Sequence, residues 1–228
     1  MTQPCRIALI HATRLAIDPI EEAASRLWPD AETISILEEG LAADRARSDA
    51  LTPALADRIV QLARYAEGAG ADGILYTCSA FGSAIETAAS TSPLPVMKPN
   101  EAMFDAAFSY GDRVSMIYTF EPAAGGLAEE FREEAERRGS EAVLNTVFSE
   151  GALDAKRTGD QQTHDRLIAE TAAAIDDADV IMLAQFSMAS AAPLARDLSG
   201  KPVLTSPEAA IEATRRRMAD AGSEASSC

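Results

Sequence analysis

A cysteine at the end of a predicted strand is the residue of this 228-residue sequence best suited to chemistry. The run from Gly73 to Thr77 is apolar without alternation, which is typical of a parallel strand covered on both faces. Cys78 follows where we expect a helix to begin, so the free amides of Ser79 and Ala80 should lie beside its sulfur. Such a position lowers the pKa of a thiol and can bind an anionic oxygen. The alternative is that Cys78 is a small buried apolar residue.

The stretch around Cys78 recurs later in the chain. Residues 71–84, ADGILYTCSAFGSA, correspond to residues 178–191, ADVIMLAQFSMASA, at an offset of 107 positions. The same offset relates RIALI at 6–10 to RVSMI at 113–117, PVM at 95–97 to PVL at 202–204, and EA at 101–102 to EA at 208–209. A shared offset indicates two copies of one α/β unit, and so long a period excludes a solenoid. Gln185 is then the counterpart of Cys78.

The alternation of predicted strands and helices along the chain determines the expected fold. Right-handed crossovers between such elements give open parallel sheets. We therefore predict an α/β fold of two pseudo-symmetric lobes, each a short parallel sheet flanked by helices, with the active site in the cleft between them. The first lobe should comprise residues 1–99 and 206–228, because the last helix, over 207–218, is expected to pack back on it. The second lobe should comprise residues 100–205.

Local sequence patterns predict where several helices and loops lie. Thr52 is expected to cap a helix over 53–68 that begins with proline, and Asp18 to cap a helix over 19–28. The polar segments 38–51 and 149–160 are expected to be loops, the first of them mobile over the cleft. The end of the chain, 222–228, has the composition of a frayed tail.

Ligands bind such sheets beyond the carboxyl ends of the strands. Those ends carry the candidate substrate-binding residues, which are His11, Thr13, Ser79, Ala80, Tyr118, Thr119, Phe120, Phe186 and Ser187. His11 either orients a carboxylate or transfers a proton, or it is a loop histidine with satisfied hydrogen bonds. Tyr118 and Phe120 either form an apolar wall over the substrate or belong to the core. His164 is expected at the surface.

Composition limits the partners and cofactors. A net charge of −16 without a basic run excludes nucleic acids and anionic membranes as expected partners. No segment has the pattern of a signal peptide or a membrane span. Three widely spaced cysteines, with Cys5 and Cys228 interpreted as incidental, predict neither a disulfide framework nor a metal site, and they favour a reducing cytoplasm. No turn carries a glycine-rich dinucleotide or phosphate loop, so we expect no cofactor.

The duplicated architecture, the Thr77-Cys78-Ser79 turn and the Pro-Val and Glu-Ala segments resemble the aspartate/glutamate racemase superfamily, which includes amino-acid and hydantoin racemases, maleate isomerases and arylmalonate decarboxylases. The resemblance implies a cytoplasmic, cofactor-independent homo-oligomer that acts at or next to the α-carbon of a small carboxylate, either an amino acid or a dicarboxylate. In typical racemases of this group each lobe supplies one cysteine, and the pair exchanges protons on opposite faces of the α-carbon. Cys78 matches the first cysteine.

Position 185 departs from the pattern of these racemases, because it holds a glutamine where the second cysteine is expected. Glutamine cannot exchange a proton near neutral pH. An alignment shifted by two would place Ser187 there, and serine is a poor acid and base unaided. A symmetric two-thiol racemisation is therefore not expected.

A single thiol leaves three alternatives. Racemase or isomerase chemistry is the first expectation; in one form the Cys78 thiolate adds to an activated double bond and leaves after rotation, as in maleate isomerase. In the second, a malonate-like substrate loses CO₂ and the Cys78 thiol protonates the enediolate, as in arylmalonate decarboxylases, whose cysteine lies in the second lobe. Amides after Cys78 and around Phe186 and Ser187, with the Thr119 hydroxyl, would bind the oxygens, while Gln185 donates a hydrogen bond. The third is a catalytically silent protein that binds a small acid.

Overall fold

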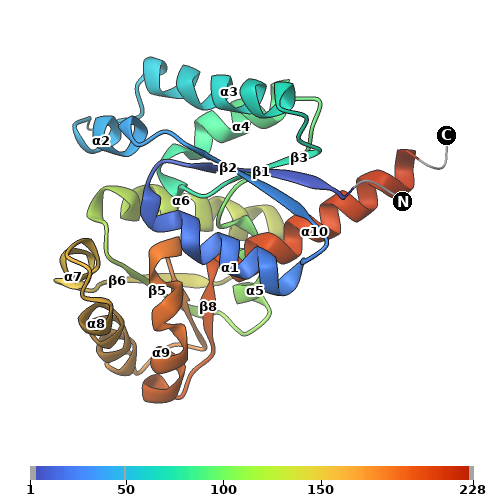
Figure 1. The fold of residues 1–228 in the computed structure, drawn as a ribbon. Coiled ribbons are helices and arrows are strands. Elements are labelled where there is room, and N and C mark those ends of the chain that lie inside the picture. The colour runs from blue at the N-terminus through green and yellow to red at the C-terminus, as the bar shows by residue number, and fades with distance from the viewer. Residues whose placement is uncertain (1–3, 49, 226–228) are drawn as a thin grey trace. The chain divides into compact units, whose positions relative to one another are not determined.

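The computed structural model describes residues 4–48 and 50–225 (Figure 1). The chain divides into two compact units, Met1–Pro99 with Ala210–Cys228, and Asn100–Ala209. Among the described residues, each unit contains one four-stranded parallel sheet flanked by helices, as the sequence predicted. Cys228 lies outside the described residues.

The first unit has the strand order β2-β1-β3-β4. Its strands are β1 (Arg6–His11), β2 (Glu32–Leu37), β3 (Gly73–Tyr76) and β4 (Val96–Met97). Its helices are α1 (Ile17–Leu27), α2 (Gly40–Ala46), α3 (Pro53–Gly68) and α4 (Gly82–Thr91), joined by the larger part of α10 (Ser206–Ala225). The last helix therefore packs on this unit: Met218 lies against Gly73, where an added Cβ would approach its sulfur to 2.7 Å.

The second unit repeats the plan in the order β6-β5-β7-β8. Its strands are β5 (Arg113–Tyr118), β6 (Val143–Phe148), β7 (Val180–Leu183) and β8 (Val203–Thr205). Its helices are α5 (Glu101–Phe108), α6 (Glu121–Arg138), α7 (Ala152–Arg157), α8 (Gln161–Ala173) and α9 (Ala192–Ser199). Equivalent strands occupy equivalent places in both sheets, which is the topology that a duplicated unit requires.

Alternate side chains of the central strands pack on opposite faces of each sheet. In the second unit, Ile181 and Leu183 of β7 join the cluster formed with α8 and α9, while Val180 and Met182 join the cluster formed with α5 and α6. In the first unit, Ile74 and Tyr76 of β3 pack with α3 and α4. Because both faces are buried, β3 and β7 are continuous apolar runs, and Cys78 and Gln185 follow beyond the ends of these strands.

The helix N-termini confirm one prediction and correct another. Thr52 caps α3, with its Oγ1 accepting a hydrogen bond from the Leu55 amide at 3.3 Å. Asp18 does not cap α1, because that helix begins at Ile17 and continues a 3₁₀ turn over Arg14–Ala16. Asp18 instead lies in the first turn, where the helix dipole favours a negative charge.

Both polar segments that were expected to be loops contain a helix. Helix α2 is held by buried Leu41 and by Arg58 of α3, whose guanidinium bonds to Glu38 and Asp44. Helix α7 has buried Ala152 at its start. A short helix needs only one buried side chain and a few ion pairs, so its composition remains polar. The backbone of α10 also continues to Ala225, beyond the expected end of the helix at 218.

A chain of hydrogen bonds joins the buried His11 to Glu21 in the first unit. His11 Nε2 lies 3.1 Å from Ser35 Oγ, and the Ser35 hydroxyl donates to Glu21 Oε1 at 2.7 Å. Since the Ser35 proton is used, Ser35 Oγ accepts from Nε2–H of His11, and Nδ1 is the acceptor in the 2.8 Å contact with Thr77 Oγ1. The Thr77 hydroxyl shares its proton between Nδ1 and the Ile10 carbonyl, which lies 3.2 Å away. Burial lowers the pKa of His11 to about 4, although the Glu21 charge acts in the opposite direction.

We expect this histidine to destabilise the fold in mild acid. Between pH 6.5 and about 4 the unfolded chain protonates His11 and the folded chain does not, so stability present above pH 6.5 is lost as the pH falls. The whole shift corresponds to about 3 kcal/mol. In His11→Gln, whose amide can still donate to Ser35, urea unfolding at pH 7 and pH 4.5 should show a smaller loss than in the wild type. Equal losses in both proteins would refute the lowered pKa.

Candidate functional site

Cys78 lies at the carboxyl end of the first unit's sheet. The Thr77 amide donates to the Ile10 carbonyl at 3.0 Å and extends the β1–β3 ladder by one residue. Cys78 then has an extended backbone and precedes a 3₁₀ turn over Ser79–Phe81, which leads into α4. The predicted strand, turn and helix are present, with the 3₁₀ turn inserted before the helix. The side chain of Cys78 is partly buried.

The prediction of a lowered pKa for Cys78 is wrong. Burial raises the pKa of the thiol above its ordinary value, while the Ala80 amide and the Arg45 charge act in the opposite direction. The amide at the turn does lower the pKa of Cys78 as expected, but desolvation of the thiol raises it by more. Cys78 therefore carries its proton near neutral pH, and the thiol is more readily an acid than a nucleophile in the resting protein.

Arg45 of α2 is a functional candidate that the sequence analysis missed. Its Nε donates to the Ala80 carbonyl at 3.3 Å and its Nη1 to the Ser48 carbonyl at 2.7 Å. In the part of the chain that the structure describes, Arg45 has no carboxylate partner, whereas Arg47 and Arg58 are paired with acids. A half-buried guanidinium that lies beside a thiol and has no counter-ion in the described part of the chain is suited to bind a carboxylate. The segment was expected to be a loop, so nothing in the sequence located this side chain.

Gln185 occupies the corresponding place in the second unit, after β7 and before a 3₁₀ turn over Phe186–Ala191. Its Oε1 accepts from the amide and hydroxyl of Thr119, at 2.9 and 3.2 Å. Because a backbone amide can only donate, this contact fixes which side-chain atom is the oxygen. Nε2 is then buried without a hydrogen-bond partner among the described residues. A buried donor without an acceptor lowers the stability of the fold by about 1–3 kcal/mol, and a hydrogen bond to a ligand oxygen would remove this penalty.

The other candidate residues fall into local groups. His11 has hydrogen-bond partners at both ring nitrogens, which fits the alternative that it is a histidine with satisfied hydrogen bonds. Thr13 caps the first 3₁₀ turn, with its Oγ1 accepting from the Leu15 amide at 3.4 Å. Phe186 and Ser187 are buried in the turn after Gln185. His164 is not at the surface as expected; it is buried in α8, with Nδ1 2.8 Å from Asp165 Oδ1.

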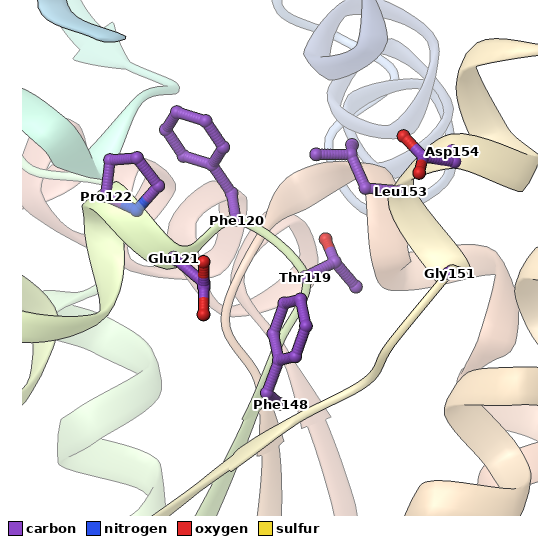
Figure 2. Close-up of a pocket in the computed structure, with 8 residues that line it drawn as sticks. All are labelled: Thr119, Phe120, Glu121, Pro122, Phe148, Gly151, Leu153 and Asp154. Atoms are coloured by element: carbon purple, nitrogen blue, oxygen red, sulfur yellow. The ribbon is translucent and has the colours of Figure 1, made fainter.

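A pocket of about 210 Å³ opens at the carboxyl ends of β5 and β6 (Figure 2). It is lined by Thr119, Phe120, Glu121, Pro122, Phe148, Gly151, Leu153 and Asp154. Phe120 thus forms part of the pocket wall. Tyr118 is half-buried, and the centroid of its ring lies 5.3 Å from that of the Phe148 ring. The sequence analysis missed Gly151, Leu153 and Asp154, because the segment that carries α7 was expected to be a loop. It also did not name Glu121, Pro122 or Phe148 as site residues.

Two absences concern only the described residues. Within 4–48 and 50–225, no group of three or more histidine, cysteine, aspartate or glutamate side chains is arranged to hold a metal ion. In the same residues, no helix is both long and apolar enough to cross a bilayer.

Solved structures with the same fold come from several enzymes. A glycine-to-cysteine variant of arylmalonate decarboxylase in a sulfate-associated form is 20% identical, with a TM-score of 0.70 over 94% of this chain and 93% of that chain. A glutamate racemase of Bacillus anthracis is 9% identical, with a TM-score of 0.76 over 97% and 84%. An allantoin racemase of Klebsiella pneumoniae is 18% identical, with a TM-score of 0.69 over 95% and 88%. At these identities the likeness establishes the fold.

A sequence search of curated proteins gave no match. The family model described as Asp/Glu/hydantoin racemase matches residues 9–215, which include the second sheet, most of the first sheet and both strand-end turns. The chain therefore belongs to the Asp/Glu/hydantoin racemase family.

Proposed function

We propose that the protein is a cofactor-independent enzyme of racemase or isomerase type that transfers a proton at or next to the α-carbon of a small carboxylate, with Cys78 as the reacting group. The observation that carries the proposal is the environment of this thiol, which follows a buried strand and lies near the Ala80 amide and the Arg45 guanidinium, which has no carboxylate partner among the described residues. Those two groups stabilise a thiolate or a substrate carboxylate in a site that is partly dry.

The second sheet supplies the complementary part of the proposal. The Gln185 amide, oriented by Thr119, donates a hydrogen bond to a substrate oxygen and exchanges no proton. That the two strand ends act on one substrate rests on the internal repeat of the sequence and on the family. The proposal also includes a cytoplasmic location, where a free thiol stays reduced, and a homo-oligomeric state.

Decarboxylation is the second candidate function, and the raised pKa of Cys78 favours it. A malonate-like dianion loses CO₂, and the bonding electrons remain on the α-carbon as an enediolate. The Cys78 thiol gives its proton to that carbon, and the resulting thiolate recovers a proton from water. This sequence needs one acid and no opposing base, which is what a chain with Cys78 and Gln185 provides.

Turnover in D₂O should separate these functions. We expect incubation with a panel of amino acids, dicarboxylates and arylmalonates to place deuterium at the α-carbon of a substrate. Incorporation without CO₂ identifies proton transfer of racemase type, and release of CO₂ identifies a decarboxylase. Cys78→Ala should lose at least roughly 100-fold in rate, which is the usual contribution of an acid–base group. Cys5→Ala is the control and should keep wild-type activity. An active Cys78→Ala enzyme would exclude Cys78 as the reacting group.

Arg45 should control both the acidity of Cys78 and the binding of carboxylates. Removing its charge in Arg45→Gln should raise the pKa of Cys78 further and slow its alkylation by iodoacetamide between pH 7 and 9, because less thiolate is present. Mass spectrometry of the Cys78 peptide separates this reaction from that of the other cysteines. Arg47→Gln, an exposed position on the same segment, is the matched control and should leave the rate profile unchanged.

A dicarboxylate or amino acid that protects Cys78 from alkylation in the wild type should protect Arg45→Gln several-fold less well. If both variants alkylate and are protected as the wild type is, Arg45 has no part in the site.

A further inference from the structure

We propose that the pocket at the carboxyl ends of β5 and β6 binds the side chain of a basic amino acid, an alkyl chain that ends in an ammonium group. The inference rests on the proposed function for the identity of the reacting carbon, but the binding that it predicts can be measured without turnover. It narrows the substrate class from small carboxylates in general to amino acids whose side chain is cationic.

The walls of the pocket suit an alkyl chain. Phe120 and Pro122 form one part of the lining, while Phe148 is the last residue of β6 and Leu153 lies in α7 (Figure 2). These side chains present carbon surface, and a volume of about 210 Å³ accommodates several methylene groups. Two phenyl rings also attract a cation through their negative faces. Long basic side chains bind in this way, with the stem on apolar surface and the charged end outward.

The charged side chains that line the pocket determine which sign of charge a ligand can carry there. Glu121 and Asp154 are its ionisable lining residues, and no lysine or arginine lines it. Glu121 has no hydrogen-bond or ion-pair partner among the residues described, and the Asp154 carboxylate lies 3.9 Å from the exposed Arg157 guanidinium. Both acids occupy the first turn of a helix, α6 and α7, where the helix dipole stabilises a negative charge. A second carboxylate on the substrate would be repelled here, whereas an ammonium group would be attracted.

Thr119 connects this pocket to the proposed reaction site. Its side chain is 3% exposed and lines the pocket, and the same residue holds Gln185 Oε1 through its amide and hydroxyl. The buried Gln185 Nε2, which has no partner in the described residues, then offers a donor to a ligand oxygen. A molecule with a carboxylate at one end and an ammonium-bearing chain at the other satisfies both features.

The test is equilibrium binding to the Cys78→Ala variant, in which the reacting group is absent. Isothermal calorimetry at low salt would compare lysine with norleucine, which has the same chain length without the charge, and with 2-aminoadipate, which ends in a carboxylate. We expect lysine to bind about tenfold more tightly than norleucine, a difference of about 1.4 kcal/mol. We expect 2-aminoadipate to bind most weakly.

Variants of Glu121 and Asp154 test whether the preference for lysine over norleucine arises in this pocket. Glu121→Gln and Asp154→Asn should each reduce the preference for lysine over norleucine, and the double variant should abolish it, with norleucine affinity unchanged. Glu150→Gln is the matched control, because it removes the same charge from the same connection without lining the pocket. If it reduces the preference as strongly, the effect is one of overall charge and the inference fails. Circular dichroism confirms that each variant is folded.

The outcomes distinguish this inference from the proposed function. Equal binding of lysine and norleucine, tighter binding of 2-aminoadipate, or no binding of any of the three overturns the inference, even if the wild type exchanges the α-proton of another amino acid. Selective lysine binding that depends on Glu121 and Asp154, without α-proton exchange or CO₂ release in the wild type, supports the inference and refutes the proposed function.

Discussion

Burial on both faces of β3 and β7 determines where the polar chemistry of this protein lies. Every side chain of these two strands is buried, so a polar group can be placed only where the strand stops. At each of these points the backbone passes through an extended residue into a 3₁₀ turn, which leaves amides without strand partners. Cys78 and Gln185 are those extended residues, and their position at the strand ends is therefore a consequence of the packing beneath them.

The two copies of the unit have diverged in what supports the residue at that point. In the first, the thiol of Cys78 lies near the Arg45 charge, while His11 and Thr77 form a buried network beside it. In the second, the Gln185 amide is held by Thr119 and offers only a hydrogen bond. In the proposed function the first copy transfers a proton and the second binds an oxygen, from equivalent positions in the two sheets.

The strands, the duplication and the Thr52 cap were predictable from apolar runs, from the repeated segments and from a threonine before a proline, because each is visible in the order of residues along the chain. Helix α2 was not predictable in this way, since Leu41 is a buried residue in a polar segment and its anchor, Arg58, lies on another helix. Arg45 was missed as a consequence. The prediction of a low pKa for Cys78 was wrong for a related reason. The turn can be derived from the local sequence, but burial raises the pKa, and Cys78 packs against a core cluster whose members, such as Ile10 and Ile59, are distant in sequence.

The net charge of the chain affects which substrates can bind. A chain of net charge −16 repels anions over its surface, so an anionic substrate depends on local donors such as the Arg45 guanidinium and the Gln185 amide. A carboxylate that enters the pocket of the second unit would meet two further negative charges, those of Glu121 and Asp154. The overall field and the pocket therefore act in the same direction. Both favour a substrate in which a single carboxylate is accompanied by a positive charge.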